Sequence, residues 1–132
     1  NKGKKIVVCK IKQVTLGLSI CYDIRFPALF RDLTKKGAQI IFIPSAFTVP
    51  TGKDHWETLL RTRAIENTVF VVATAQCGRH HNNRKTYGHS MIINPWGKII
   101  RKTTSLPKIL NSSINLEEIK VIRLRMPSIY HD

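Results

Sequence analysis

The sequence predicts an α/β fold with a mixed β-sheet, in one domain that spans residues 1–132. Two patterns predict it: short apolar runs, alternating or continuous, that are typical of strands, and longer segments with apolar residues at helical spacing. A strand, a helix and a strand follow one another with short connections over residues 14–44, and this order predicts parallel neighbouring strands. The 132 residues, 42% of them hydrophobic, are enough to bury a core.

The central prediction is a strand over residues 14–20 that ends at a cysteine. Apolar residues alternate with small or polar ones along it, and a tight connection at residues 12–13 pairs it with a strand over residues 5–11. Pro27 then stands where the first turn of a helix tolerates proline. Cys21 therefore lies at the carboxyl end of a strand and before a helix, where backbone N–H groups and the helix dipole favour a thiolate. Cys21 is our candidate nucleophile, and an inert thiol in the core is the alternative interpretation.

A helix and a buried strand are predicted next. Residues 28–36 have the pattern of a helix, and Gly37 stands at its C-terminal stop. The continuous apolar run over residues 38–44 predicts a fully buried strand. We expect this strand to be the parallel neighbour of the strand over residues 14–20.

A second helix is predicted after a loop over residues 45–53, in which Pro50 and Gly52 are read as breakers. Asp54 is its expected N-cap, because Glu57 follows at the spacing of a capping box. The expected buried face consists of Trp56, Leu59, Leu60 and Ala64. Arg61 and Arg63 are expected on a solvated face, with some pairing to Glu57 and Glu66.

The second half of the chain predicts further strands and one more helix. This helix is capped by Asn115 and ends before Pro127, and a turn over residues 94–97 joins two of the strands. The predicted helices fall on one side of the sheet, so its other face lacks cover, which indicates a missing or swapped layer. The expected strands lie over residues 69–75, 87–93, 98–101 and 109–114, with a polar loop over residues 76–86.

The charge of the chain is strongly positive. Lys and Arg number 22 against 8 Asp and Glu, so the formal net charge is +14. Such an excess raises nucleic-acid binding as a hypothesis. The basic residues are spread along the chain without an RNA- or DNA-binding motif, so we do not expect nucleic acid as the main partner. An acidic remainder elsewhere in a larger assembly is the second explanation.

The cysteines and the hydropathy indicate the cellular setting. Three cysteines are an odd number, so we read all of them as free thiols, with Cys9 and Cys77 as packing residues. No apolar run approaches the length of a membrane span, and no apolar block of a signal peptide follows the N-terminus. We expect a cytoplasmic protein that does not bind a membrane.

The histidine-rich loop raises a metal site as a hypothesis. Cys77, His80, His81 and His89 offer three or four donors, but their spacing matches neither a zinc finger nor a catalytic zinc pattern. We therefore expect no metal and no cofactor. His55 or His89 could serve a cysteine–histidine hydrolase, but the spacing selects neither of them.

The residues around the cysteine resemble a known family. Residues 17–27, Gly-Leu-Ser-Ile-Cys-Tyr-Asp-Ile-Arg-Phe-Pro, resemble the nucleophile segment of the nitrilase superfamily of carbon–nitrogen hydrolases. The Nit subgroup, which includes deaminated glutathione amidases and ω-amidases, is the most similar. The resemblance covers nearly the whole chain, and its other segments are residues 44–52, 55–57, 60–67, 75–81, 87–91 and 94–97. Asn94 departs from the Asp that many relatives carry there.

The resemblance implies a four-layer αββα sandwich of which this chain supplies the C-terminal half. The family's mechanism uses Glu, Lys and Cys, and only the Cys has a matching position, at Cys21. Residues 1–20 contain no acidic residue, and we read Glu57 and Glu66 as structural. The expectation is a chain that is inactive unless another polypeptide supplies the N-terminal half, and a homo-oligomer when complete.

The resemblance implies an amidase that acts on small carboxylate-bearing amides, with deaminated glutathione as the candidate substrate. The backbone N–H of Tyr22 would hold the oxyanion. Arg25 would pair with a substrate carboxylate, and a structural ion pair with Asp23 or with a helix carboxylate is the alternative of equal weight. Phe47 and Thr48 follow a buried strand and are pocket candidates. A catalytically silent remnant or interaction module, and a basic nucleic-acid-binding module, are the alternative functions.

Overall fold

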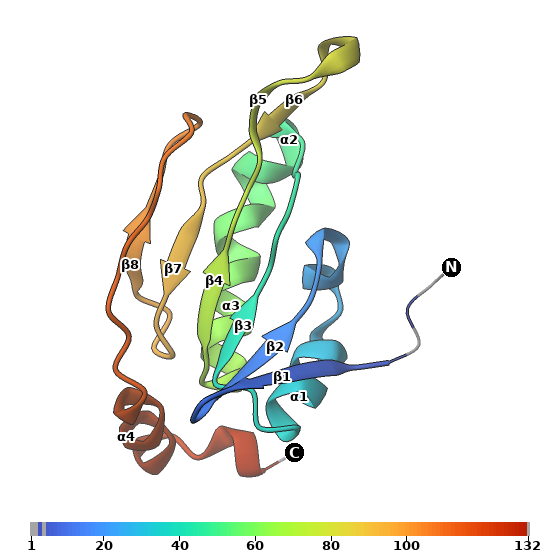
Figure 1. Ribbon diagram of the computed structural model, residues 1–132. Helices are drawn as coiled ribbons and strands as arrows, with labels where there is room; N and C mark the ends of the chain where they lie inside the picture. The colour runs from blue at the N-terminus through green and yellow to red at the C-terminus, as the bar shows by residue number, and fades with distance from the viewer. Residues whose placement is uncertain (1–2, 4, 132) are drawn as a thin grey trace.

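A mixed six-stranded sheet is the centre of the computed structural model, which describes residues 3 and 5–131 (Figure 1). Its strand order is β1-β2-β3-β4-β7-β8. β2, β3 and β4 are parallel, whereas β1 on one side and β7 and β8 on the other pair antiparallel. The predicted mixed α/β fold is confirmed. The strands are β1 (Val7–Ile11), β2 (Val14–Leu18), β3 (Ile40–Phe42), β4 (Phe70–Ala73), β7 (Met91–Ile93) and β8 (Ile99–Lys102).

Two helices cover one face of this sheet, α1 (Pro27–Lys35) and α3 (Glu57–Asn67), both behind the strands in Figure 1. A two-stranded ribbon extends beyond the end of the sheet where β3 and β4 finish. The remaining elements are the 3-10 turn η1 (Cys21–Arg25), α2 (Val49–Thr51), the π-helical segment η2 (Gly52–Trp56), β5 (Cys77–Arg79), η3 (His81–Asn83), β6 (Lys85–Tyr87), α4 (Glu117–Arg125) and η4 (Ser128–Tyr130).

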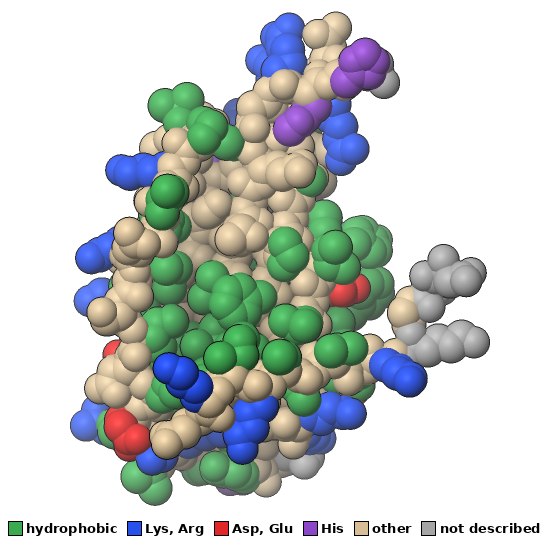
Figure 2. All heavy atoms as spheres, viewed as in Figure 1, with side chains coloured by type: hydrophobic (Ala, Val, Ile, Leu, Met, Phe, Trp, Pro, Cys, Tyr) green, Lys and Arg blue, Asp and Glu red, His purple; other side chains and the backbone are tan. Residues whose placement is uncertain are grey.

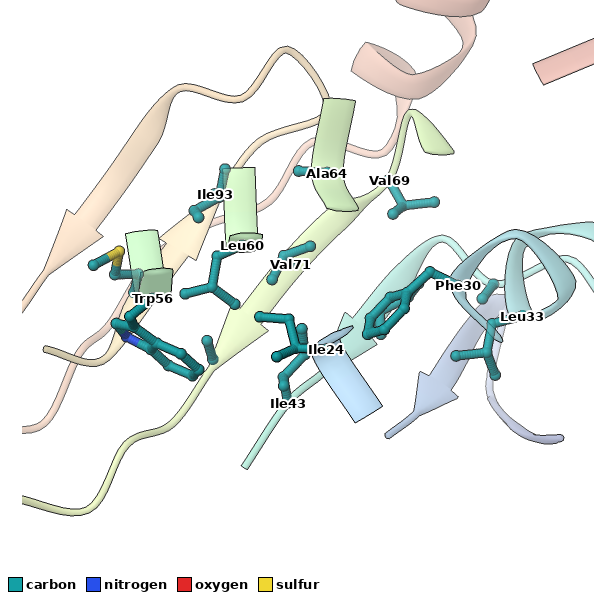
Figure 3. Packing of buried hydrophobic residues seen from close by; sticks show 14 of the residues in the cluster. Ile24, Phe30, Leu33, Ile43, Trp56, Leu60, Ala64, Val69, Val71 and Ile93 are labelled. Carbon is teal, nitrogen blue, oxygen red and sulfur yellow. The ribbon is translucent and has the colours of Figure 1, made fainter. Parts of the chain in front are cut away.

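The hydrophobic core lies between the sheet and these two helices (Figure 3). Trp56 is its largest fully buried side chain, and the indole Nε1 donates a hydrogen bond of 2.9 Å to the carbonyl of His89. Ile24, from the η1 turn, is fully buried and lies near Ile43 and Phe30. The turn that begins at Cys21 is therefore anchored in the core by a side chain three residues further on.

The opposite face of the sheet is apolar and is not covered by α1 or α3. Figure 2 shows hydrophobic side chains gathered at the centre of this face. On β2, β3 and β4, Gly17, Ile41 and Val71 face the core. Because side chains alternate between the two faces of a strand, the residues before and after each of these three lie on the open face. The half-buried or exposed apolar residues assigned in this way are Leu16, Leu18, Ile40, Phe42 and Val72. The predicted uncovered face is confirmed for these residues, whereas Phe70 and Ile92, which pair with Ile40 and Val72 on the same face, are buried.

The start of the second long helix differs from the prediction. Helical structure begins at Val49, with Thr48 as N-cap, and continues through η2 into α3, so Asp54 is not a cap. Pro50 lies in the first turn, where a helix tolerates proline. Gly52 has helical dihedrals, and a Cβ on it would lie 2.2 Å from the Tyr87 ring. The residues read as breakers therefore belong to the helix, and one of them permits close packing.

Arg63 was predicted as solvated, which is wrong. Its side chain is 4% exposed, and its Nε donates to the carbonyl of Ile24 at 2.9 Å. Its Nη1 pairs with Glu66 at 2.8 Å. Arg61, two residues earlier, is exposed as predicted and donates from Nε to the carbonyl of Gly97.

Three further predictions need correction. Residues 109–114 form no strand, the polar loop contains the β5–β6 ribbon, and Cys9 is exposed on β1 where a packing residue was expected. Residues 109–114 have no strand partner among the described residues. The pairing of the β5–β6 ribbon depends on contacts that a local pattern does not encode. No helix in the described part of the chain is long and apolar enough to cross a bilayer.

Candidate active site

Cys21 lies where the chain leaves the end of β2. Ser19 and Cys21 continue the backbone pairing with β3, because Ser19 N–H donates to Phe42 and Cys21 N–H donates to the carbonyl of Pro44 at 2.8 Å. Cys21 has φ +45°, in the left-handed region that residues with a Cβ seldom adopt. Such a conformation costs on the order of 1–3 kcal/mol and persists only where the surroundings impose it. The sharp turn at Cys21 is therefore held by its surroundings.

Four contacts hold the turn. The carboxylate of Asp23 accepts the Ile20 N–H at 2.8 Å, and the Asp23 N–H donates to the carbonyl of Ile20. The Ile24 side chain is buried in the core, and its carbonyl accepts from Arg63. Tyr22 is the second residue of η1, and the N–H groups of a first helical turn have no acceptor within the helix. That the Tyr22 N–H holds an oxyanion beside Cys21 stays a prediction.

We expect Asp23→Ala to lower the free energy of unfolding by about 1 kcal/mol, because the Ile20 N–H loses the carboxylate that caps the turn. Urea unfolding followed by circular dichroism measures the change. Asp54→Ala is the matched control: Asp54 is exposed, no hydrogen bond of its side chain is seen among the described residues, and its effect should stay below about 0.5 kcal/mol. Equal effects of the two substitutions would contradict the capping role.

A hollow of about 540 Å³ opens beside Cys21. Its wall is formed where β2, β3 and β4 end, and because these strands are parallel, their carboxyl ends meet at one edge of the sheet. Cys21 is half-buried: it packs against the edge of the core and also lines the hollow. The hollow is lined by Ile20, Cys21, residues 44–46, residues 74–76, Ser90 and Lys108.

Arg25 lies beside the hollow without lining it. Its guanidinium stacks 5.4 Å from the ring centroid of Phe47 and 5.7 Å from that of Tyr22, and its Nη2 is 3.4 Å from His55 Nδ1. Both Arg25 and Asp23 are in the described part of the chain, and no ion pair joins them. The ion-pair alternative for Arg25 is therefore not observed, and its role in holding a carboxylate stays a prediction.

Tyr22, Phe47 and Thr48 are not placed in the wall of the hollow. The Tyr22 side chain is exposed and contacts Phe26 edge-on. Phe47 is 6% exposed and packs on Trp56 at 4.8 Å between ring centroids. The Thr48 hydroxyl hydrogen-bonds that of Thr51. The contribution of these three residues to substrate binding stays a prediction. Phe47 would contribute by positioning the guanidinium of Arg25, which stacks on its ring.

The sequence analysis missed five polar residues of the hollow. Ser45 follows the carboxyl end of β3, and Thr74 and Gln76 follow that of β4, a position that could have identified them. Ser90 precedes β7 and accepts the Ala75 N–H at 2.9 Å through its hydroxyl. No sequence pattern could have identified Lys108, because the segment that contains it has no regular structure.

Among the residues that the structure describes, no group of three His, Cys, Asp or Glu side chains is placed to hold a metal ion.

Comparison with known proteins identifies the family. The model of the carbon–nitrogen hydrolase family matches residues 1–124. A deaminated glutathione amidase of Synechocystis is 53% identical over 116 residues, which cover 88% of this chain and 43% of that protein. The deaminated glutathione amidase of Dictyostelium discoideum is 48% identical over 98% of this chain and 45% of its own length. The chain thus spans less than half the length of these relatives.

Solved structures show the same relationship. The NitFhit protein of C. elegans matches with a TM-score of 0.85 and 48% identity, over 89% of this chain and 28% of that one. Nit3 of Saccharomyces cerevisiae, a member of the nitrilase superfamily, matches with a TM-score of 0.91 and 34% identity, over 96% of this chain and 47% of that one. The chain therefore belongs to the carbon–nitrogen hydrolase family, as the resemblance of its nucleophile segment predicted.

Proposed function

We propose that the chain carries the nucleophile of an amidase, in which Cys21 attacks the carbonyl carbon of a small carboxylate-bearing amide. The observation that supports the proposal is the position of the half-buried Cys21 thiol, in a turn with φ +45°, beside a hollow of about 540 Å³. The hollow is formed at the carboxyl ends of parallel strands, where α/β proteins bind their ligands.

The chemistry of the proposal follows from these residues. The thiolate forms a bond to the carbonyl carbon, and the oxyanion that results is held by the Tyr22 N–H. The C–N bond then breaks, the departing amine takes a proton, and water cleaves the thioester to release the acid and the thiol. In the family, the proton is carried by a Glu and a Lys ammonium helps to hold the oxyanion.

We further propose that a segment with this Glu and this Lys completes the site, since residues 1–20 offer no acidic residue. Two observations support it: the chain spans less than half the length of its relatives, and the open face of the sheet is apolar. A second layer packed on that face would bring the missing groups to the hollow. Reduced free thiols fit a cytoplasmic enzyme, and a homo-oligomer is proposed for the completed protein.

The proposed substrate is deaminated glutathione, on which the named relatives act. The carboxylate of such a ligand would meet the guanidinium of Arg25, which has no carboxylate partner in η1. Arginine is suited to this task because its planar fork matches a carboxylate.

Complementation tests the proposal. The chain is mixed or co-expressed with the segment that precedes the matched region in the Synechocystis amidase, and amine or ammonia release from deaminated glutathione and short ω-amides is measured. We expect release from the mixture and a fall of about 10²- to 10⁴-fold when the Glu of the added segment is changed to Gln, because general acid–base catalysis contributes about that factor.

The controls separate the alternatives. Release by the chain alone, at the rate of the mixture, would contradict the need for the added groups. No release from any combination, together with salt-dependent binding of polyanions, would favour the nucleic-acid-binding alternative that the net charge of +14 suggests.

A further inference from the structure

A second hollow, of about 390 Å³, opens between the β5–β6 ribbon and the helical segment that begins at Val49. None of its lining residues lines the hollow beside Cys21, so the proposed amidase chemistry does not use it. Its volume lies in the range of pockets that bind small organic molecules. Its polar side chains include those of Lys53, Arg79, Lys85, Tyr87, His89 and Ser105.

The second hollow is positively charged and lacks a balancing carboxylate. Lys53 on η2, Arg79 on β5 and Lys85 on β6 line it, and no Asp or Glu does. The stretch over residues 67–116 contains no acidic residue, and Figure 2 shows Lys, Arg and His side chains but no acidic one at the visible end of the ribbon. Within the described part of the chain these three cations form no ion pair, and only Arg79 has a side-chain hydrogen bond, to Asn83 Oδ1 at 3.3 Å.

The pairing of the ribbon places two of these cations side by side. Arg79 and Lys85 are directly opposite residues of the antiparallel strands β5 and β6. The Cβ atoms of such a pair lie about 4.5–5.5 Å apart, and like charges at this position destabilise the pairing. An anion placed between the two side chains would replace their repulsion by attraction to both.

The third cation is held beside the ribbon by the packing of its neighbour. Gly52, which precedes Lys53, lies against the Tyr87 ring, and the Tyr87 N–H donates to the carbonyl of Phe47 at 2.9 Å. The Tyr87 ring in turn stacks on that of His89, with 3.9 Å between the centroids. The backbone positions that carry the three charges are therefore fixed relative to one another, although they belong to three separate elements.

We propose that the second hollow binds the phosphate group of a small molecule, with Lys53, Arg79 and Lys85 as the cationic groups that hold it. A phosphate group carries a charge of about −1.5 to −2 at neutral pH and three acceptor oxygens, so it can meet several cations at once. The hydroxyl groups of Tyr87 and Ser105 add further donors at the wall. This site is independent of the chemistry at Cys21.

Calorimetric titration of the intact chain with inorganic pyrophosphate tests the proposal, at one fixed salt concentration because salt screens exposed charges. Inorganic phosphate and glycerol 3-phosphate are titrated in parallel, and the tighter of the two shows whether the hollow takes the free ion or an ester. Succinate supplies two carboxylates without phosphate and should bind more weakly than pyrophosphate. Succinate binding as tight as that of pyrophosphate, or no binding of any phosphate compound, would overturn the proposal.

Lys85→Gln, and separately Lys53→Gln, should weaken pyrophosphate binding about fivefold, the upper end for the loss of one exposed ion pair. Arg84→Gln is the matched control, because Arg84 adjoins Lys85 and is exposed but does not line the second hollow. Its effect should stay below about twofold. An equal effect of Arg84→Gln would show a general attraction of anions to a chain of net charge +14, and unchanged affinity in both lysine variants would likewise refute the site.

Two further measurements separate the site from the other functions considered for the chain. Cys21→Ala should bind pyrophosphate as tightly as the unchanged chain, and a loss of affinity there would place the anion in the hollow beside Cys21. A single-stranded oligonucleotide tests the nucleic-acid alternative. If it binds while pyrophosphate does not, and Arg84→Gln weakens it as much as Lys85→Gln, the basic residues form a nucleic-acid surface and the proposed site fails.

Discussion

Replacing Cys21 by alanine should abolish amide hydrolysis by the complemented protein, with a fall in kcat of at least about 10⁴-fold. Alanine has no atom that can form the thioester, so the covalent route is lost and not merely slowed. The rate of product release from deaminated glutathione, measured at saturating substrate, gives the comparison. Substrate affinity should change little, because the thiol is one small part of the wall of the hollow.

Cys9→Ala is the matched control for that experiment, because Cys9 is exposed on the edge strand β1. It should retain full activity. Alanine at position 21 must adopt the same φ of +45° as cysteine, so urea unfolding should show a stable chain and exclude misfolding as the cause. Hydrolysis that survives in Cys21→Ala would remove Cys21 from the mechanism.

The position of Cys21 was predictable because the signals for it are local. The alternation over residues 14–20 sets the strand, and Pro27 sets the first turn of α1, so the stretch between them must turn. The parallel order of β2, β3 and β4 follows from the short connections. Local signals thus sufficed to place the candidate nucleophile at the correct edge of the sheet.

The errors arose where a distant residue decides the structure. From the sequence, Gly52 is interpreted as a helix breaker. In the structure it lies within a helix, and the Tyr87 ring packs against it so closely that a side chain is excluded. Lys108 lines the hollow because of pairing between residues 103–104 and 89–90, which no local pattern encodes. In each case a tertiary contact overrides local propensity.

Arg63→Met should be among the most destabilising single changes in α3, by about 2–4 kcal/mol. The carbonyl of Ile24 would lose its buried donor, and an unsatisfied buried acceptor costs about 1–3 kcal/mol. Glu66 would lose its partner as well, but its side chain is 30% exposed, so water compensates for part of that loss. The methionine stem keeps the contact with Phe30, which the guanidinium now covers at 5.4 Å.

Arg61→Met is the control that isolates burial, since the two arginines lie two residues apart on α3. Arg61 also donates to a carbonyl, that of Gly97, but it is exposed, so water can replace the hydrogen bond and the expected cost is below about 1 kcal/mol. Urea midpoints of the two variants give the difference. Because the Ile24 carbonyl belongs to η1, Arg63→Met should also loosen the turn at Cys21 and change its rate of alkylation, whereas Arg61→Met should not. Equal destabilisation by both variants would show that Arg63 acts through helix propensity and not through the turn.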